Sequence, residues 1–328
     1  MPSSSTVGVG EPGHYNCAMH RAAMAWITGT VISALERGDA IDPKSLTFLL
    51  RRYGETGAPE LRAALEPALA HALEHHAGEA AGDAHARWLT LFAEALTLSE
   101  DDRLHAAATD LIAALRGRWG QPGDVGHQAS GVEACLVACH VVDPQTLVPA
   151  AIDELERIVG AAYRVGLGLG RFDAGDARGW IPDHVRTASA LLTAYEITGR
   201  LPYSMLAEEL VQFVRRTKWG EAAGRFEEPE LDDRALFVVN CDAARVLSRL
   251  AHLHGRDDYR AGAVCGTCTP DRRIDRATRD DLRAVFAADL SCPALASAAS
   301  TFRVIRAYAI RQTETDYRSL RVLDDMFG

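Results

Sequence analysis

The stretch DHVRTASALLTAYEITGRLPYSMLAEELVQFVRRTKWG, residues Asp183–Gly220, contains two helical patterns separated by a short break. The break falls at Thr198–Gly199, and glycine suits the left-handed backbone conformation that ends many helices. Because the turn is so short, the two helices are predicted to pack as an antiparallel hairpin. The second helix carries its apolar residues at helical spacing, at Leu206, Leu210, Phe213 and Val214.

The same plan recurs along the chain, which indicates a repeat architecture. Residues 45–76 place Tyr53, Thr56 and Gly57 where the first unit has Tyr195, Thr198 and Gly199. Two further units have a predicted break between their helices: residues 85–120, with Ser99 and Leu104 near the turn, and residues 127–163, broken at Asp143–Pro144. The remaining pieces are residues 240–263, with Gly255 and Tyr259 at the turn, a first helix at 292–311, and a helix at about Tyr15–Arg37.

About six first helices, five second helices and one N-terminal helix predict an all-α (α/α)6 toroid of antiparallel hairpins. The first helices are rich in Ala, Ser and Leu, as an inner ring requires, and the second helices carry charges on one side. An open solenoid of the same hairpins is the structural alternative. We expect a disordered tail at 1–13 and one domain at 14–328.

Three segments between the predicted helices do not show helical spacing of apolar residues. Residues 171–183 and 221–238 are long enough for short hairpins or ordered loops. The glycine-rich stretch at 165–172 lacks the Lys-Ser/Thr of a phosphate-binding loop, and no strand precedes it. It is interpreted as a flexible loop between repeats.

Composition and charge exclude several classes of protein. The chain has 328 residues, of which 48% are hydrophobic and 24% charged, so a buried core is expected rather than disorder. The net charge of −10, with Arg interleaved among Asp and Glu, argues against nucleic-acid binding. No apolar run is long enough to cross a bilayer, and the N-terminus lacks the pattern of a signal peptide. These features predict a cytoplasmic protein without membrane association.

Seven cysteines are scattered through the chain and are expected to stay reduced. Cys265 and Cys268 form a C-x-x-C, but no second ligand pair follows, so an exposed loop is favoured over a metal or redox site. Cys135, Cys139 and His140 lie at helical spacing, where packing is favoured over ligation. No metal and no cofactor are predicted.

The stretches at 183–219, 224–230 and 240–260 together carry a resemblance to a known family. They resemble the helical C-terminal region of the spermatogenesis-associated type of thioredoxin-domain proteins, which belongs to the six-hairpin glycosidase-like superfamily. The resemblance extends over roughly Tyr163–Ala263 and is specific for fold rather than activity. The quoted stretches contain no thioredoxin-like domain, so no redox role is expected. The superfamily includes glycoside hydrolases, N-acylglucosamine 2-epimerase-like isomerases and polysaccharide lyases, whose sites lie in the funnel at one end of the inner ring.

When the repeats are aligned on their turns, polar residues gather where the first helices begin. His85, Gln128, His184 and Asn240 take equivalent places in four repeats, and His14, Tyr15 and Asn16 are possible additions. Asp183 and Asn240 are ordinary helix-capping types, whereas capping explains His85, His127 and His184 poorly. The residues assigned to substrate binding are His85, Arg87, Trp88, Gln128, Trp180, Arg186 and Asn240, and those assigned to catalysis are Asp183, His184, Asp242 and His127.

Two mechanisms fit this rim, and both act on a sugar-like small molecule. A glycoside hydrolase needs two carboxylates, for which Asp183 and Asp242 are available, with Asp232 or Asp233 as substitutes. Trp88 or Trp180 would stack on a sugar ring.

An epimerase or lyase needs acid–base groups that titrate near neutral pH, which His184 and His127 supply, with Arg186 or Arg87 holding an anionic oxygen. A non-catalytic binding or scaffold toroid is the rival class. The sequence does not indicate an oligomeric state.

Overall fold

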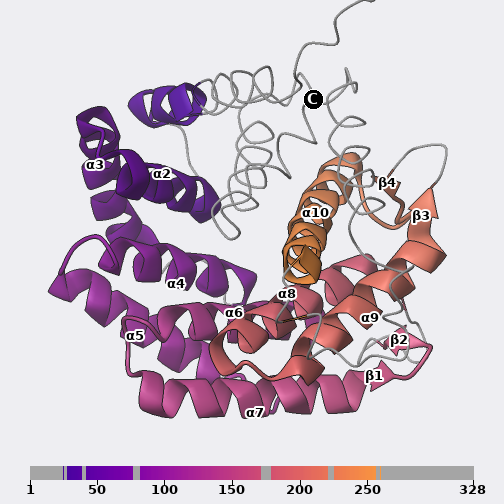
Figure 1. Cartoon of the computed structure of the whole chain (residues 1–328). Helices are drawn as coiled ribbons and strands as arrows, with labels where there is room; N and C mark the ends of the chain where they lie inside the picture. Colours follow the sequence, from indigo (N-terminus) through magenta and orange to yellow (C-terminus); the bar gives the residue numbers. More distant parts are fainter. Residues whose placement is uncertain are drawn as a thin grey trace, which may run out of the picture.

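The structure is a computed structural model that describes residues 25, 28–38, 42–76, 82–170, 179–220, 225–255 and 259. The described part is almost entirely helical. Its helices are α2 (Pro43–Thr56), α3 (Pro59–His75), α4 (Asp83–Leu96), α5 (Asp102–Arg116), α6 (Val125–Ala138), α7 (Pro144–Ala162), α8 (Ile181–Thr198), α9 (Leu201–Lys218) and α10 (Asp233–Gly255). Figure 1 shows the hairpins following one another around a curve, from α2 and α3 to α10.

The predicted hairpin of residues 183–220 is confirmed as α8 and α9. Gly199 ends α8 with φ of 68°, and its N–H donates to the Tyr195 carbonyl at 2.7 Å. Gly57 ends α2 in the same way, with φ of 62° and a 2.8 Å bond to the Tyr53 carbonyl. The preceding threonine hydroxyl bonds back to its own helix in both turns. The repeat seen in the sequence is therefore a repeat of turn chemistry.

The helices form two layers. The inner helices α2, α4, α6, α8 and α10 pack side by side in that order, and α3, α5, α7 and α9 each pack on the inner helix of their own hairpin. Every residue of α8 from Ile181 to Ala194 is buried except Arg186. By contrast, α9 buries one face only, at spacings of three and four residues. This difference in burial matches the inner and outer layers that the composition predicted.

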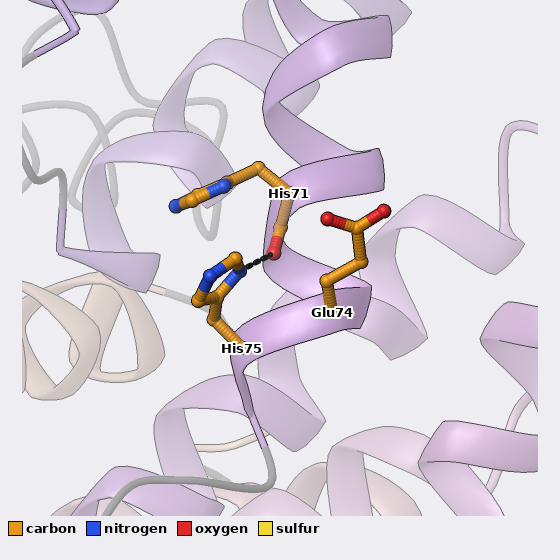
Figure 2. Close-up of side chains that lie close together, drawn as sticks. All are labelled: His71, Glu74 and His75. Atoms are coloured by element: carbon orange, nitrogen blue, oxygen red, sulfur yellow. Dashed lines mark hydrogen bonds between the residues drawn. The ribbon is translucent and has the colours of Figure 1, made fainter.

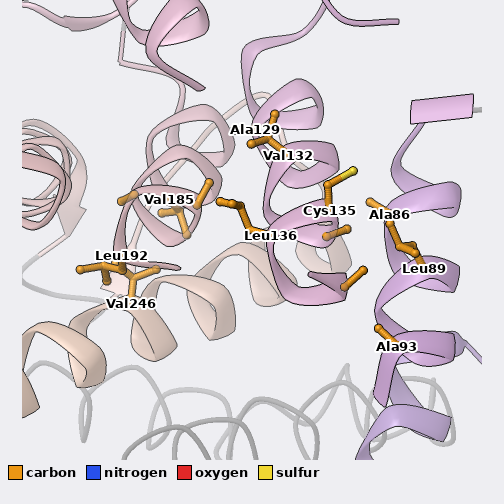
Figure 3. Close-up of a cluster of buried hydrophobic side chains, with 14 of the residues drawn as sticks. Ala86, Leu89, Ala93, Ala129, Val132, Cys135, Leu136, Val185, Leu192 and Val246 are labelled. Atoms are coloured by element: carbon orange, nitrogen blue, oxygen red, sulfur yellow. The ribbon is translucent and has the colours of Figure 1, made fainter. Parts of the chain in front are cut away.

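Small side chains let the inner helices approach one another. Figure 3 shows a cluster of buried side chains, many of them alanine or valine, in which residues of α6 lie between those of α4 and those of α8 and α10. Cys135 of α6 is fully buried in this cluster, and burial raises the pKa of its thiol to about 12. Cys139 is buried as well, so the packing interpretation of both cysteines is confirmed. Their reactivity as thiolates is suppressed in this environment.

Two short β-hairpins join outer helices to the next inner helices. Strand β1 (Tyr163–Arg164) pairs with β2 (Gly168–Leu169), and β3 (Trp219–Gly220) pairs with β4 (Arg225–Phe226). The second pair lies partly in a segment for which a short hairpin was expected. The first pair corrects the prediction of a flexible loop at 165–172, as far as Gly170. Gly166 and Gly168 have φ of 73° and 69°, which permits the tight turn.

A second correction concerns α10, which begins at Asp233 rather than at Asn240. The Asp232 carboxylate accepts the Ala235 N–H at 2.7 Å, which caps the helix seven residues earlier than the repeat pattern suggested.

Several predictions lie outside the described residues: the tail at 1–13, the helix at 292–311, and His14, Tyr15, Asn16, Cys265 and Cys268. Of the predicted N-terminal helix, residues 28–36 are helical. Within the described ranges, no helix combines the length and the apolar character that crossing a bilayer requires.

Candidate active site

A cavity of about 560 Å³, a volume typical of small-molecule sites, lies between the inner helices. All five inner helices line it. The lining side chains are Lys44, Thr47 and Arg51 of α2; Asp83, Ala86, Arg87, Thr90 and Glu94 of α4; Ser130, Glu133, Ala134, Leu136 and Val137 of α6, with His140 just beyond it; Val185, Arg186, Ser189, Thr193, Glu196 and Ile197 of α8; and Asp242, Arg245 and Arg249 of α10.

The polar lining residues repeat at helical spacing. In α8 they are Arg186, Ser189, Thr193 and Glu196, and α10 has Asp242, Arg245 and Arg249 at intervals of three and four. Such spacing puts them on one face of each helix. Both α8 and α10 therefore present polar side chains to the cavity along one face, whereas α6 contributes the apolar Ala134, Leu136 and Val137 beside Ser130 and Glu133.

Glu133 is a centre of hydrogen bonding in the cavity. Its Oε1 accepts from the Ser189 hydroxyl at 2.7 Å and from the Thr193 hydroxyl at 3.0 Å. The Arg249 guanidinium, which is 3% exposed, lies 3.5 Å from the same oxygen. All these contacts end on Oε1, so the position of the Glu133 carboxyl group is well determined while Oε2 takes no part in them.

Asp242 lies across the cavity on α10. Lys44 Nζ is 3.5 Å from its Oδ1, and Arg245 Nη1 is 4.0 Å away. Burial alone raises the pKa of Asp242, but the charges of Lys44, Arg245 and Arg186 outweigh it and lower this pKa below its ordinary value. Asp242 is therefore ionised at neutral pH.

Arg245 joins the two carboxylates. Its Nη1 faces Asp242, and its Nη2 lies 4.0 Å from Glu133 Oε1 and donates to the Ser189 hydroxyl at 2.9 Å. The two acids therefore face each other across a single guanidinium. A gap of that kind is compatible with the separation of several ångströms between the two carboxyl groups of glycosidases.

The other lining acids are also close to cations. Arg186 Nη2 is 3.5 Å from Asp83, and Arg249 Nη2 is 3.1 Å from Glu196. Arg51 forms an ion pair with Glu94. Among the lining residues that the structure describes, six are Lys or Arg and five are Asp or Glu. This part of the lining is thus not acidic, although the chain carries a net charge of −10.

Three of the residues predicted from the sequence line this cavity, namely Arg87, Arg186 and Asp242. Arg87 Nη1 lies 3.4 Å from Asp42 Oδ2, at the start of α2. The structure thus brings one predicted carboxylate together with both predicted arginines.

His184 is placed elsewhere, fully buried between α8 and the first β-hairpin. Its Nδ1 donates to the Trp180 carbonyl at 2.9 Å, and its Nε2 accepts the Leu169 N–H at 2.9 Å. The ring stacks on Phe213. Burial lowers the pKa of His184 to about 4, so the imidazole is neutral. Its contacts give it the role of anchoring the β-hairpin.

Asn240 has the matching role at the second β-hairpin. Its amide accepts the Phe226 N–H at 2.9 Å and donates to the Phe226 carbonyl at 3.0 Å. In the two β-hairpins, Leu169 pairs with Tyr163 and Phe226 pairs with Trp219. Tyr163 and Trp219 are the C-cap residues of the outer helices α7 and α9. His184 and Asn240 are therefore equivalent in position, as predicted, and both hold backbone rather than line the cavity.

Asp183 is buried and accepts the Gly126 N–H at 3.0 Å, which joins the start of α8 to the start of α6. His127 is exposed and lies 3.5 Å from Asp124. Gln128 bonds to the Gln121 carbonyl at 2.7 Å.

The side chains of Asp183, His127 and Gln128 are not among the lining residues. Five other predicted site residues are also absent from the lining: His85, on the first turn of α4; Trp88, packed on Phe92; Trp180, at the N-cap of α8; Asp232; and Asp233.

The sequence reasoning missed Glu133, Arg245 and Arg249. A signal existed for the two arginines, because Arg245 and Arg249 are a polar pair four residues apart in α10, as Ser189 and Thr193 are in α8. His140, which had been grouped with the buried cysteines, is exposed and lines the cavity.

No protein-family model matches the sequence, and no curated protein matches it either. Solved structures do match. The unsaturated glucuronyl hydrolase of Bacillus sp. GL1, responsible for the degradation of glycosaminoglycan, superposes with a TM-score of 0.62 at 12% identity, covering 89% of this chain and 95% of that one. The GH76 α-mannanase of Bacteroides thetaiotaomicron has a TM-score of 0.63 at 10% identity, covering 95% and 100%.

The fold is an (α/α)6 toroid. A third match, the GH76 α-1,6-mannanase of Salegentibacter sp., has a TM-score of 0.52 at 10% identity and covers 88% of this chain and 99% of that one. These structures have the six-hairpin glycosidase fold, in which the hairpins form a closed ring. The prediction of a toroid is therefore confirmed, and the alternative of an open solenoid is not. The narrower resemblance to the spermatogenesis-associated proteins stays a prediction.

Proposed function

We propose that the protein is a carbohydrate-active enzyme, a glycoside hydrolase that binds a small sugar in the central cavity. One observation carries the proposal: Glu133 of α6 and Asp242 of α10 face each other across Arg245 inside a cavity of about 560 Å³. Two carboxyl groups on opposite sides of a bound sugar are what glycosidic bond cleavage requires. The fold shared with three glycoside hydrolases supports this assignment.

The two acids differ in environment, which suggests different roles. Asp242 has a lowered pKa and is ionised, so it suits the role of base or nucleophile at the anomeric carbon. Glu133 is held through Oε1, and its Oε2 is the atom that would carry a proton to the leaving glycosidic oxygen. This pair replaces Asp183 and Asp242, because Asp183 lies outside the lining and accepts the Gly126 N–H at the start of α6.

The charge of the lining favours a sugar that carries a carboxylate. In the described part of the lining, six cationic side chains stand against five acidic ones, so the lining carries a slight positive charge although the chain as a whole is strongly acidic. Arg87 and Arg186 are the side chains we assign to the substrate carboxylate, because arginine binds carboxylates through two parallel hydrogen bonds. One of the three similar structures is named for its action on a glucuronyl group, and the other two are named mannanases.

A second candidate is a sugar-binding toroid without catalysis. The observation that favours it is that each of the five lining carboxylates lies within ion-pair distance of an Arg or Lys side chain. Paired in this way, the carboxylates and cations fix one another's positions, as a binding site requires. The isomerase or lyase alternative has less support, because neither His127 nor His184 lines the cavity and, among the residues that the structure describes, His140 is the imidazole that does.

The test is hydrolysis of a panel of disaccharides and aryl glycosides with terminal uronate, mannose or glucose, with release of reducing sugar as the measurement. We expect turnover of a uronate-bearing substrate, and we expect Glu133→Gln and Asp242→Asn to lower kcat by ~10²–10⁴-fold. The matched control is Asp153→Asn, an exposed carboxylate of α7, which should leave kcat unchanged.

Calorimetric titration of the same sugars separates the two candidates. Binding without turnover supports the sugar-binding toroid. If no member of the panel binds or reacts, the carbohydrate function is wrong.

A further inference from the structure

The last turns of α3 carry a cluster of potential metal ligands outside the cavity. His71, Glu74 and His75 are all exposed, and each offers a ligand atom within 4.8 Å of those of the other two. Figure 2 shows the two imidazoles one turn apart on the same side of the helix, with the Glu74 carboxylate beside them. The ring centroids of His71 and His75 are 3.9 Å apart. None of the three residues lines the cavity.

The spacing of the two histidines suits chelation. Side chains at positions i and i+4 lie one above the other on a helix surface. A single dication can therefore take one nitrogen from each imidazole without any change in the backbone, and the Glu74 carboxylate can add an oxygen.

The hydrogen bond of His75 orients its ring for this role. Its Nδ1 lies 2.9 Å from the His71 backbone carbonyl, which can only accept, so Nδ1 carries the proton. The lone pair of the neutral ring is then on Nε2, away from the helix backbone. Metal-bound histidines commonly donate their other ring N–H to a carbonyl in this way.

The position at the end of the helix also favours a cation. His75 is the last residue of α3, where the carbonyl groups give the helix terminus a partial negative charge. The neighbouring His76 has another function, because its Nδ1 contacts the Leu73 carbonyl at 3.0 Å and its ring packs edge-on against Phe92. The cluster is therefore the group of three residues and not a run of histidines.

We propose that His71, Glu74 and His75 form a surface site for a divalent transition-metal ion such as Zn²⁺ or Ni²⁺. Two imidazoles and one carboxylate select such ions over Mg²⁺ and Ca²⁺, which prefer ligand sets made of oxygen alone. Water completes the coordination. The bound ion joins side chains of successive turns and so stabilises the C-terminal end of α3. This effect is independent of the chemistry in the cavity.

The test is calorimetric titration of the full-length chain without an affinity tag, in a reducing buffer, with NiCl2. We expect one bound Ni²⁺ that is lost in His71→Ala and in His75→Ala and weakened in Glu74→Gln. The matched control is His105→Ala, an exposed histidine of α5, which should bind as the wild type does. Thermal unfolding should show a higher midpoint with Ni²⁺ for the wild type and no such rise for the two alanine variants.

Circular dichroism in EDTA confirms that the variants are folded, which is expected because the three side chains are exposed. Unchanged Ni²⁺ binding in both His71→Ala and His75→Ala would overturn the proposal, as would equal loss of binding in His105→Ala. Equally tight binding of Mg²⁺ would overturn the assignment to transition metals.

Discussion

His184 shows how a single buried residue links stability to pH. Its imidazole is neutral in the folded protein and anchors the Leu169 N–H and the Trp180 carbonyl. Burial lowers its pKa from an ordinary 6.5 to about 4, so between these values the unfolded chain binds a proton that the folded chain does not. The stabilising contribution of His184 is therefore complete above pH 6.5 and is lost as the pH falls toward 4.

The predicted loss is up to about 3 kcal/mol of unfolding free energy between pH 6.5 and pH 4. Urea unfolding of the wild type and of His184→Gln at pH 7 and pH 4.5 measures it. The variant should be less stable at pH 7, because the Leu169 N–H and the Trp180 carbonyl lose hydrogen bonds of good geometry. Its stability should nevertheless fall less than that of the wild type between pH 7 and pH 4.5. Equal pH dependence in the two proteins would contradict the assignment.

The residue scale also explains why two predicted site residues have structural roles. His184 and Asn240 each bond to the second strand of the preceding hairpin, at the position that faces the end of an outer helix. Their side chains were recognised as equivalent in sequence, and that equivalence is real. It reflects a repeated way of fastening a hairpin to an inner helix.

At the scale of elements, the inner helices depend on close approach at their starts. Gly126 opens α6, and its N–H bonds to Asp183 of α8. A Cβ at this position would lie 2.8 Å from Asp183 Oδ1 and 3.1 Å from its Cα, which belongs to the backbone and cannot move away easily.

Gly126→Ala is therefore predicted to destabilise the fold by about 1–3 kcal/mol through overpacking, although alanine is the better helix former. The matched control is Gly160→Ala in α7, where a Cβ meets no atom within 4 Å, and this change should stabilise by about 0.4–1 kcal/mol. Urea unfolding of both variants gives the comparison. Similar effects of the two substitutions would show that the contact between α6 and α8 is not tight.

At the scale of the whole molecule, the cavity exists because the inner helices lie side by side around it, of which the described residues contain α2, α4, α6, α8 and α10. A ligand in it contacts helices that are far apart in the chain. Such a ligand binds the folded protein alone and so stabilises it, by about 2.7 kcal/mol when its concentration is a hundred times its Kd.

Because Lys and Arg side chains line the cavity, we expect ligands that carry a carboxylate to stabilise the protein more than neutral ones. Glucuronate is expected to raise the thermal midpoint more than glucose at the same concentration, because it carries a carboxylate to the cationic side chains. The difference should shrink at high NaCl concentration, where charges are screened, and it should be smaller in Arg186→Gln. Equal shifts for the two sugars would argue for a neutral substrate.

Much of the architecture could be predicted because its signals are local. Gly57 and Gly199 end helices in a backbone conformation that few other residues adopt, and Asp143–Pro144 separates α6 from α7. The start of α10 was missed because the capping residue Asp232 lies outside the repeating pattern.

The site was harder to predict, and Glu133 and Arg249 show why. A helical period identifies faces of a helix, but it does not say which face looks toward the axis of a ring and which toward a neighbour. Glu133 lies more than a hundred residues before Arg249, and the two meet only because the hairpins α6–α7 and α8–α9 bring α10 to the same cavity as α6.

The amino-acid sequence alone determined the helical hairpins, their order and their inner and outer layers, since turn residues and apolar spacing act over a few residues. The tertiary structure decided which polar side chains line the cavity. It placed His184 and Asn240 in hydrogen bonds to the backbone of the β-hairpins, and it placed Glu133 in the cavity. The physical reason is that ion pairs and burial form between helices distant in the chain, so the packing of the inner helices sets both the charge of the cavity and the ionised state of Asp242.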